Sequence, residues 1–345
     1  MRVFIISIIL IFTLNFSTAI LSASEITLRE IESELNQTKD LNITKLWKRL
    51  GLNPAQNATY FGCNLTKDKE CVLEKESWKY KIFSSEWATK KYNGFKILQL
   101  SYWDYQLLIF QKEDKRWIYR EHIDLPGQKV NPPEIKFYKT DNNPLLFSVE
   151  YLGTYGTGIL GFYITFYRCI DGKIKPVLDL IKRGHVWGWP GLMFNRKFEA
   201  KLLPFSNKKG NEIGFVYSAD YYSNTESYNS RYDLPENPDY RDPFLETLGI
   251  DIPKVKDFLL FSLKRKAYFI WDENKKEYKI DKQRSEFQTK DEIDAIFSAD
   301  NIRFYKYYKK EIENLKKSGN KFQKEWVEKF FEEIKEEKKS VKEKR

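Results

Sequence analysis

The sequence predicts a mainly β protein with helical ends, of the α+β class, because three patterns divide it along its length. From about residue 78 to residue 282, runs of five to eight Tyr, Phe, Trp, Ile and Val residues alternate with charged or Gly/Asn turns, as antiparallel strands do. No helical pattern lies between those runs, which disfavours a parallel β-α-β sheet. Apolar residues recur at a spacing near 3.6 residues only before and after this region, where helices are expected.

The first 24 residues have the order of a secretory signal peptide: a basic start, an apolar segment and a small-residue end. The apolar run of about 12 residues is shorter than the roughly 20 that a membrane span needs. Cleavage is expected after Ala19, Ala23 or Ser24. We therefore expect export to the periplasm or the cell exterior, with no integral membrane span after signal removal. The alternative is an uncleaved N-terminal anchor.

Residues 25–76 are predicted to form a helical segment followed by a Cys-bearing connection. Thr27 and Glu30 have the Thr-x-x-Glu spacing of a capping box, in which side chain and backbone bond reciprocally at a helix start. Cys63 and Cys71 lie eight positions apart in a polar stretch. In an oxidising compartment they form a natural disulfide pair. The alternative is two unrelated thiols.

Residues 77–285 are predicted to form a β-rich domain with about three similar units, at roughly 79–125, 134–180 and 198–282. Each unit contains about four strands, and repeats of this length are typical of propeller-like blades. Because three blades would not close a typical propeller, an open stack of meanders or a two-sheet sandwich is equally compatible with the pattern. A polar insertion at 223–253 interrupts the third unit and is expected to be a long surface loop.

Residues 286–345 are predicted to form an amphipathic helical hairpin with a charged tail. Thr289 and Glu292 again have capping-box spacing, and two apolar stripes follow with Ser318 to Asn320 between them. The apolar faces are expected to pack against the sheet body or against a partner.

The basic charge is concentrated in this C-terminal region. The chain carries a net charge of +10, and residues 301–345 contain 15 Lys and Arg against 9 acidic residues. Peripheral attraction to an anionic membrane or wall polymer is expected, since such attraction needs only net charge. The signal peptide and the interspersed acidic residues argue against a nucleic-acid partner.

Known cofactor and metal motifs fit the sequence poorly, so neither a cofactor nor a metal is expected. The chain has two histidines, His122 and His185, and no Cys/His spacing suited to zinc. Gly156, Gly158 and Gly161 match G-x-G-x-x-G, but a dinucleotide site needs a helix after the glycines. The following residues read as a strand, which indicates a glycine-rich hairpin.

Three residues are weak catalytic candidates. His185 lies beside a Trp-Gly-Trp-Pro-Gly turn, where an imidazole can act as acid, base or stacking group. Glu150 and Asp220 occupy equivalent places in the second and third units, and two carboxylates that face one cleft can hydrolyse a glycosidic bond. Each candidate also has a purely structural interpretation. For His185 it is a loop whose indole rings cover the end of a sheet, and for the two carboxylates it is acidic residues that end strands.

A set of aromatic residues is a candidate ligand platform, because exposed rings can stack on sugars. The set is Tyr151, Tyr155, Trp187, Trp189, Tyr221 and Tyr222. In a chain with 16% aromatic residues, most rings must instead be core or strand-pairing residues.

The expected function is an exported cell-envelope or secreted binding protein, without catalytic activity, whose partner is an unidentified protein or glycan. The alternative is an extracytoplasmic, carboxylate-dependent hydrolase that acts on a polysaccharide. A third interpretation makes the C-terminal hairpin a docking element for a partner.

Overall fold

The structure is a computed structural model of the 345-residue chain; it describes residues 25–52, 70–91, 94–102, 105–125, 132–140, 145–156, 159–186, 193–204, 210–223, 259–298 and 300–343. The chain divides into two compact units, Met1–Pro132 and Pro133–Arg345. The division falls inside the segment 77–285, which the sequence pattern treats as one β-rich domain. It does so because the described strands on either side of Pro132 pair only within their own unit.

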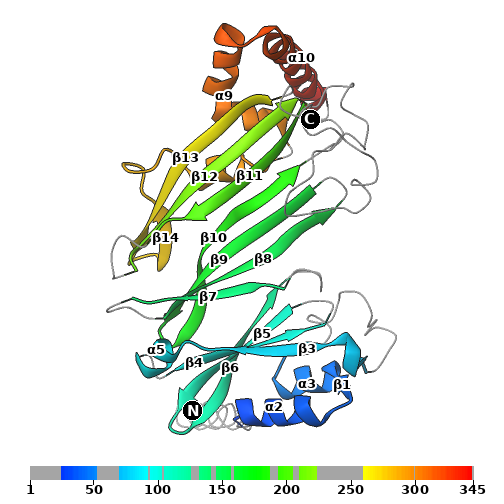
Figure 1. The fold of residues 1–345 in the computed structure, drawn as a ribbon, viewed down its shortest axis with the longest axis vertical. Helices are drawn as coiled ribbons and strands as arrows, with labels where there is room; N and C mark the ends of the chain where they lie inside the picture. The colour runs from blue at the N-terminus through cyan, green and yellow to red at the C-terminus, as the bar shows by residue number, and fades with distance from the viewer. Residues whose placement is uncertain are drawn as a thin grey trace, which may run out of the picture. The chain divides into compact units, whose positions relative to one another are not determined.

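The first unit contains a four-stranded antiparallel sheet that corresponds to the first expected repeat, 79–125 (Figure 1). In order across the sheet its strands are β3 (Lys79–Phe83), β4 (Phe95–Ser101), β5 (Tyr105–Glu113) and β6 (Arg116–Leu125). The other described elements are α2 (Leu28–Gln37), the paired strands β1 (Asp40–Asn42) and β2 (Val72–Glu74), α3 (Ile43–Arg49), the 3-10 helix η1 (Lys75–Ser77) and α5 (Glu86–Lys91).

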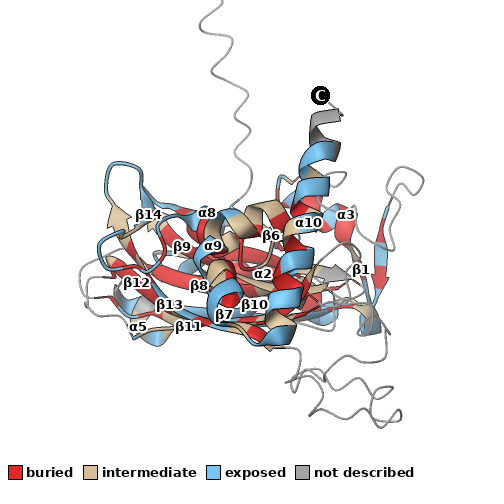
Figure 2. Cartoon of the chain, turned by 90° about the horizontal axis from the view of Figure 1, so that it is seen from above, coloured by how far each residue is buried: buried red, intermediate tan, exposed pale blue. Residues whose placement is uncertain are grey.

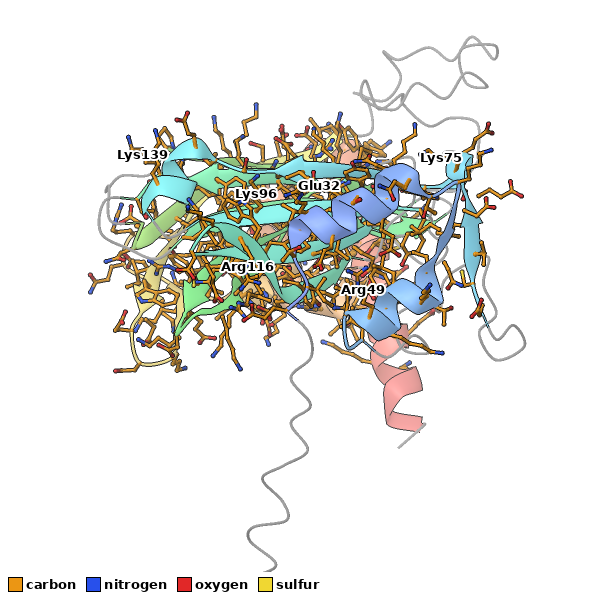
Figure 3. The ribbon with its side chains drawn as sticks, turned by 90° about the horizontal axis from the view of Figure 1, so that it is seen from below. Glu32, Arg49, Lys75, Lys96, Arg116 and Lys139 are labelled. Atoms are coloured by element: carbon orange, nitrogen blue, oxygen red, sulfur yellow. The ribbon has the colours of Figure 1, made fainter. Side chains whose placement is uncertain are left out.

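The predicted capping box starts α2, which confirms this part of the sequence interpretation. The Thr27 backbone N–H donates to Glu30 Oε2 at 2.7 Å, and the Glu30 N–H donates to Thr27 Oγ1 at 3.3 Å. The apolar side of α2 is buried in one core with residues of β4 and β5. Figure 3 labels Arg49 on α3, whose guanidinium lies 2.5 Å from Glu34 of α2 and ties the two helices together.

The second unit contains an eight-stranded antiparallel sheet in which every strand pairs with its neighbour in sequence (Figure 1). The strands are β7 (Glu134–Tyr138), β8 (Leu146–Gly156), β9 (Ile159–Ile170), β10 (Lys173–Val186), β11 (Phe194–Leu202), β12 (Glu212–Ser223), β13 (Leu259–Asp272) and β14 (Glu277–Ile280). The predicted class, mainly β with antiparallel sheets and helical ends, is therefore confirmed.

The expected second and third blades are not separate, because β10 and β11 join them into this single sheet. Their pairing covers only four residues of each strand, Arg183–Val186 with Arg196–Glu199. In contrast, β10 pairs with β9 along almost its whole length, with irregularities between Pro176 and Leu178 and between Ile181 and Arg183. N-terminal to Arg183, β10 no longer pairs with β11. Along this part of β10 the ladder with β9 contains the two irregularities, which bend a strand, and Pro176, which has no N–H to donate.

The C-terminal helices are α8 (Lys290–Asp294), α9 (Asn301–Ser318) and α10 (Lys321–Glu343), and they pack on the second unit. Phe304 and Tyr308 of α9 and Trp326 of α10 share a core with Phe194 and Tyr221 of the sheet. Figure 2 shows the division along α9 and α10, with buried residues on one side and exposed residues on the other. The predicted helical hairpin thus forms, and its apolar faces belong to the core of this unit rather than to a free arm.

Several sequence predictions lie outside the described residues. They concern the signal peptide (1–24), Cys63 and almost all of the insertion 223–253. Cys71 is buried, and its pairing with Cys63 stays a prediction. Among the described residues, no helix combines the length and the apolar character that crossing a membrane requires.

Candidate functional site

Two pockets in the second unit are lined by carboxylates. The larger has a volume of about 340 Å³ and is named here the Glu150 pocket. The smaller has a volume of about 260 Å³ and is named the Asp294 pocket. The two pockets differ in how their acidic groups are compensated, and this difference separates a structural site from a candidate functional site.

The Glu150 pocket forms where β10 and β11 part. Strands β7 to β11 all contribute to it, and its charged lining residues are Glu134, Lys136, Glu150, Lys182, Glu199 and Lys201. At its wall, the Tyr138 hydroxyl and Ser148 Oγ share a hydrogen bond of 2.8 Å, and burial raises the pKa of Tyr138 to about 12.

Two cations hold Glu150 in place. Its carboxylate accepts hydrogen bonds from Lys182 Nζ and, at 3.0 Å, from Arg183 Nε. The Glu150 side chain is only 10% exposed, so these two partners satisfy a nearly buried charge. Because β8 carries the acid and β10 carries both bases, the cluster ties two strands across the intervening β9. A nearly buried acid that is held by two bases on another strand is typical of an ion pair with a structural role.

The Asp294 pocket lies between the sheet and the start of the helical hairpin. Its polar lining residues are Tyr163 of β9, Asp179 of β10, Lys290 and Asp294 of α8, Ser298 of the following turn and Arg303 of α9. Leu180, Ile181 and Phe297 supply its apolar walls. The pocket therefore combines two carboxylates, two cations and two aromatic rings.

Local contacts fix the position of the helical residues that line this pocket. Thr289 caps α8, accepting the Glu292 N–H on its hydroxyl at 3.2 Å. After α8 the chain turns, and the fully buried Arg196 of β11 donates from Nη2 to the Phe297 carbonyl at 3.1 Å. Gly161 makes room for the ring at this turn, because a Cβ there would lie 2.9 Å from Phe297 Cζ.

Asp294 differs from Glu150 because it is partly buried without a close ion pair to any described residue. Among the described residues it forms no ion pair within 4.0 Å, although Lys290 and Arg303 line the same pocket. Burial raises the pKa of Asp294, Lys290 and Arg303 lower it, and Asp291 and Asp179 raise it further. A carboxyl of this kind holds a proton more readily than an exposed one, and it remains available to a ligand.

A polar and aromatic surface continues from the Asp294 pocket across β8 and β9. The rings of Tyr151 and Tyr163 stack at 6.1 Å between centroids, with 24° between their planes. Gly153 allows this arrangement, since a Cβ there would lie 2.4 Å from Cδ2 of Tyr163. Beside the rings, the Thr165 hydroxyl donates to Asp179 Oδ1 at 2.6 Å. Stacked rings beside hydroxyl and carboxylate groups suit a ligand with one apolar face and many hydroxyls.

The structure does not bring Glu150 and Asp220 into one cleft. Glu150 lies on β8 and Asp220 on β12, four strands apart, which is roughly 19 Å across a sheet at ordinary strand spacing. Asp220 lines neither pocket and accepts a hydrogen bond from Ser262 Oγ at 2.5 Å. The two-carboxylate mechanism predicted for this pair therefore lacks its geometry.

His185 lies on β10 opposite Lys197 of β11, which in turn lies opposite Asp220. Burial lowers the pKa of His185, and the charge of Lys197 lowers it further. The imidazole is therefore neutral at pH 7. It lines neither the Glu150 pocket nor the Asp294 pocket.

The structure removes Tyr221 from the predicted aromatic platform. Tyr221 is completely buried and packs against Phe194, Phe261 and Phe304, so it belongs to the core. Tyr222 follows it in the strand and points to the opposite face, because side chains alternate along a strand. Tyr151 lies beside the Asp294 pocket, because its ring stacks on that of the lining residue Tyr163. Trp187, Trp189 and the side chain of Tyr155 lie outside the described residues.

The sequence analysis missed the residues that form the Asp294 pocket. Asp179 is one acidic residue among many in a strand, and Asp294 sits in a short helix more than 100 positions later. The capping-box spacing of Thr289 and Glu292 locates that helix, but nothing local indicates that α8 packs beside β10.

Neither a metal site among the described residues nor a known relative indicates a function. In the described part of the chain, no three His, Cys, Asp or Glu side chains gather closely enough to hold a metal ion. The chain matches no protein-family model, no curated protein and no solved structure. The candidate function is therefore argued from the pocket itself.

Proposed function

We propose that this chain is an exported binding protein of the cell envelope or the extracellular space, and that it binds a saccharide without chemical conversion. The observation that carries the proposal is the Asp294 pocket with its adjoining Tyr151–Tyr163 surface. Sugar rings present an apolar face to an aromatic ring and hydroxyls to carboxylates and amines. The pocket offers both kinds of group, together with an acid that no described base neutralises.

Binding of neutral oligosaccharides tests the proposal directly. Folded protein is titrated calorimetrically with the oligosaccharides that a glycan array identifies. Tyr163→Ala and Asp179→Asn should each weaken binding by about tenfold, which is about 1.4 kcal/mol. Asp124→Asn is the matched control, because Asp124 also accepts a side-chain hydrogen bond, from Gln106, but lies in the first unit. Equal effects of Asp179→Asn and Asp124→Asn, or an array without any bound glycan, would contradict the proposal.

The rival function is a polysaccharide hydrolase that uses Asp294 and Asp179. Its specific support is the asymmetry within one pocket, where burial raises the pKa of Asp294, the group suited to act as general acid. Hydrolysis would release new reducing ends from a polysaccharide, and Asp294→Asn would abolish that release. Absence of reducing-end release by the wild-type protein, on a polysaccharide that it binds, favours the binding function.

Export is part of the same proposal. The N-terminal residues have the order of a signal peptide, and cleavage after Ala19, Ala23 or Ser24 is expected. Mass spectrometry of the protein purified from the periplasm or medium should find one of these new termini. It should also find a mass lower by two hydrogen atoms without reductant, as a Cys63–Cys71 disulfide requires. Full-length protein retained in the cytoplasm would contradict export.

A further inference from the structure

The exposed side of α9 is strongly basic. Its exposed lysines are Lys306, Lys309, Lys310, Lys316 and Lys317, named here the lysine stripe. Lys306 precedes a kink of α9 at Tyr308, and the other four lysines follow it. At 100° per residue those four positions fall within roughly 120° of the helix circumference, and they span about 12 Å of helix length. Glu313 is the acidic residue within this arc, and it pairs with Lys309 at 3.5 Å.

The neighbouring helix shows that this charge pattern is specific to α9. The exposed side of α10 alternates signs, as in Lys324, Glu325, Glu328 and Lys329. Both helices belong to one hairpin and both bury an apolar stripe. A basic face that merely kept the hairpin soluble would gain nothing from carrying a single acidic residue, Glu313, on this side of one helix and mixed charges on the other.

The lysine stripe begins at the rim of the Asp294 pocket. Arg303, which lines the pocket, lies one turn of α9 before Lys306. The pocket itself is balanced, with two carboxylates against two cations, whereas the stripe beyond it is positive. A linear ligand that leaves the pocket along α9 would therefore pass from a site with balanced charges onto a positively charged surface.

The apolar side of α9 is already occupied. Phe304, Tyr308, Ile312 and Leu315 are buried in the core of the second unit, so they cannot insert into a lipid bilayer. Among the described residues, the exposed large apolar side chain is Val72, in the first unit. Interfacial membrane helices anchor through a large apolar face beside their basic residues. A water-soluble polyanion therefore fits this surface better than a membrane does.

We propose that the lysine stripe binds the negative groups of a linear acidic polysaccharide, one part of which occupies the Asp294 pocket. This proposal rests on the saccharide-binding function and adds the class of ligand. The pocket provides the contacts to the sugar rings, and the stripe provides charge that is complementary to carboxylate or phosphate groups along the polymer.

The test compares two variants of the full mature chain with equal change in net charge. The first replaces the five lysines of the stripe with Gln; the second replaces Lys324, Lys329, Lys335, Lys338 and Lys339 of α10 with Gln. The probes are a linear polyuronate and neutral dextran. Circular dichroism and thermal unfolding confirm that both variants fold, since all ten positions are exposed.

The stripe variant should bind the polyuronate about tenfold more weakly than the α10 variant at low salt. That difference should disappear when the ionic strength rises from about 0.05 M to about 0.5 M, because the Debye length falls below 5 Å. Equal losses in the two variants would overturn the proposal. So would stripe-dependent binding of phosphatidylglycerol vesicles without polyuronate binding, or duplex DNA bound as tightly as the polyuronate.

Failure of this inference can be distinguished from failure of the proposed function. If Tyr163→Ala weakens binding of both neutral and acidic saccharides while the stripe variant weakens neither, the pocket binds sugar and the stripe has no role. If the stripe variant weakens polyuronate binding while Tyr163→Ala has no effect, the ligand is bound by charge alone and the pocket assignment is wrong.

Discussion

Glu150 and Asp294 are both acidic residues in pockets of the same unit, yet they differ in their surroundings. Glu150 accepts hydrogen bonds from Lys182 and Arg183, and its side chain is 10% exposed. Asp294 has cations in its pocket but no ion pair among the described residues, and burial raises its pKa. The difference teaches that acidic character alone does not identify a functional residue. An acid whose charge is already satisfied holds the fold together, and an acid that is not satisfied can bind something else.

The largest effect is expected at Glu150. The variant Glu150→Gln should lower the free energy of unfolding by about 2 kcal/mol, because two partly buried cations lose their counter-charge. Urea unfolding measures this loss. Glu134→Gln in the same pocket is the control, since Glu134 is exposed, and it should change stability by less than about 0.5 kcal/mol. Similar losses for the two variants would remove the distinction between the pockets.

A double-mutant cycle measures how strongly Glu150 and Lys182 stabilise the fold through their contact. Lys182→Met alone should cost about 1 kcal/mol, because Arg183 remains to compensate Glu150. Combined with Glu150→Gln, the two losses should be less than additive by about 1 kcal/mol, as for groups in direct contact. Additive losses would mean that the close contact contributes nothing to stability.

Replacing Asp294 should raise the stability at pH 7, which is the opposite of the effect expected at Glu150. Burial raises its pKa in the folded state, so the folded protein binds more protons than the unfolded chain, and stability falls as pH rises through that range. Asp294→Asn should therefore be slightly more stable than the wild type at pH 7, by less than the Lys182→Met loss. The two proteins should become equal below about pH 4, near the ordinary pKa of an Asp. Thermal unfolding from pH 4 to pH 7 checks this, and a loss of stability at pH 7 would contradict it.

The smallest effect is expected at Asp220. Its side chain is bonded to the exposed Ser262, so Asp220→Asn should change stability by less than about 0.5 kcal/mol. Saccharide affinity, measured by the same titration as for Asp179→Asn, should stay unchanged. Loss of binding in this variant would restore Asp220 as a site residue.

The local structure of this chain was largely predictable. The capping box at Thr27 and the side-chain cap at Thr289 start helices where their spacing indicates, because a cap depends on residues only three positions apart. At Thr289 the reciprocal half of the predicted box is replaced, since the Glu292 side chain accepts from the Gln288 N–H. The expected repeat at 79–125 forms a four-stranded sheet for a similar reason, since β4, β5 and β6 connect through short segments, although α5 lies between β3 and β4. Gly156 ends β8 and Gly161 lies in β9, as their flanking strand patterns suggest, and Gly158 lies outside the described residues.

The candidate site was not predictable, because its residues meet only through long-range packing. Tyr221 and Tyr222 were grouped from sequence adjacency, yet a strand sends neighbours to opposite faces, and the register of β12 decides which ring is buried. Glu150 and Asp220 were grouped from equivalent repeat positions, but the intervening strands separate them.

The sequence by itself determined the succession of strands and helices, the amphipathic hairpin and the concentration of basic charge at its end. Those features follow from spacing and composition within short windows. Only the tertiary structure decided that the two later repeats merge through four residues of β10 and β11, and that α8 and α9 close a pocket over β9 and β10. It also decided that Glu150 is compensated whereas Asp294 is not. These outcomes depend on which distant segments pack together, and no short stretch of sequence determines the free energy of that packing.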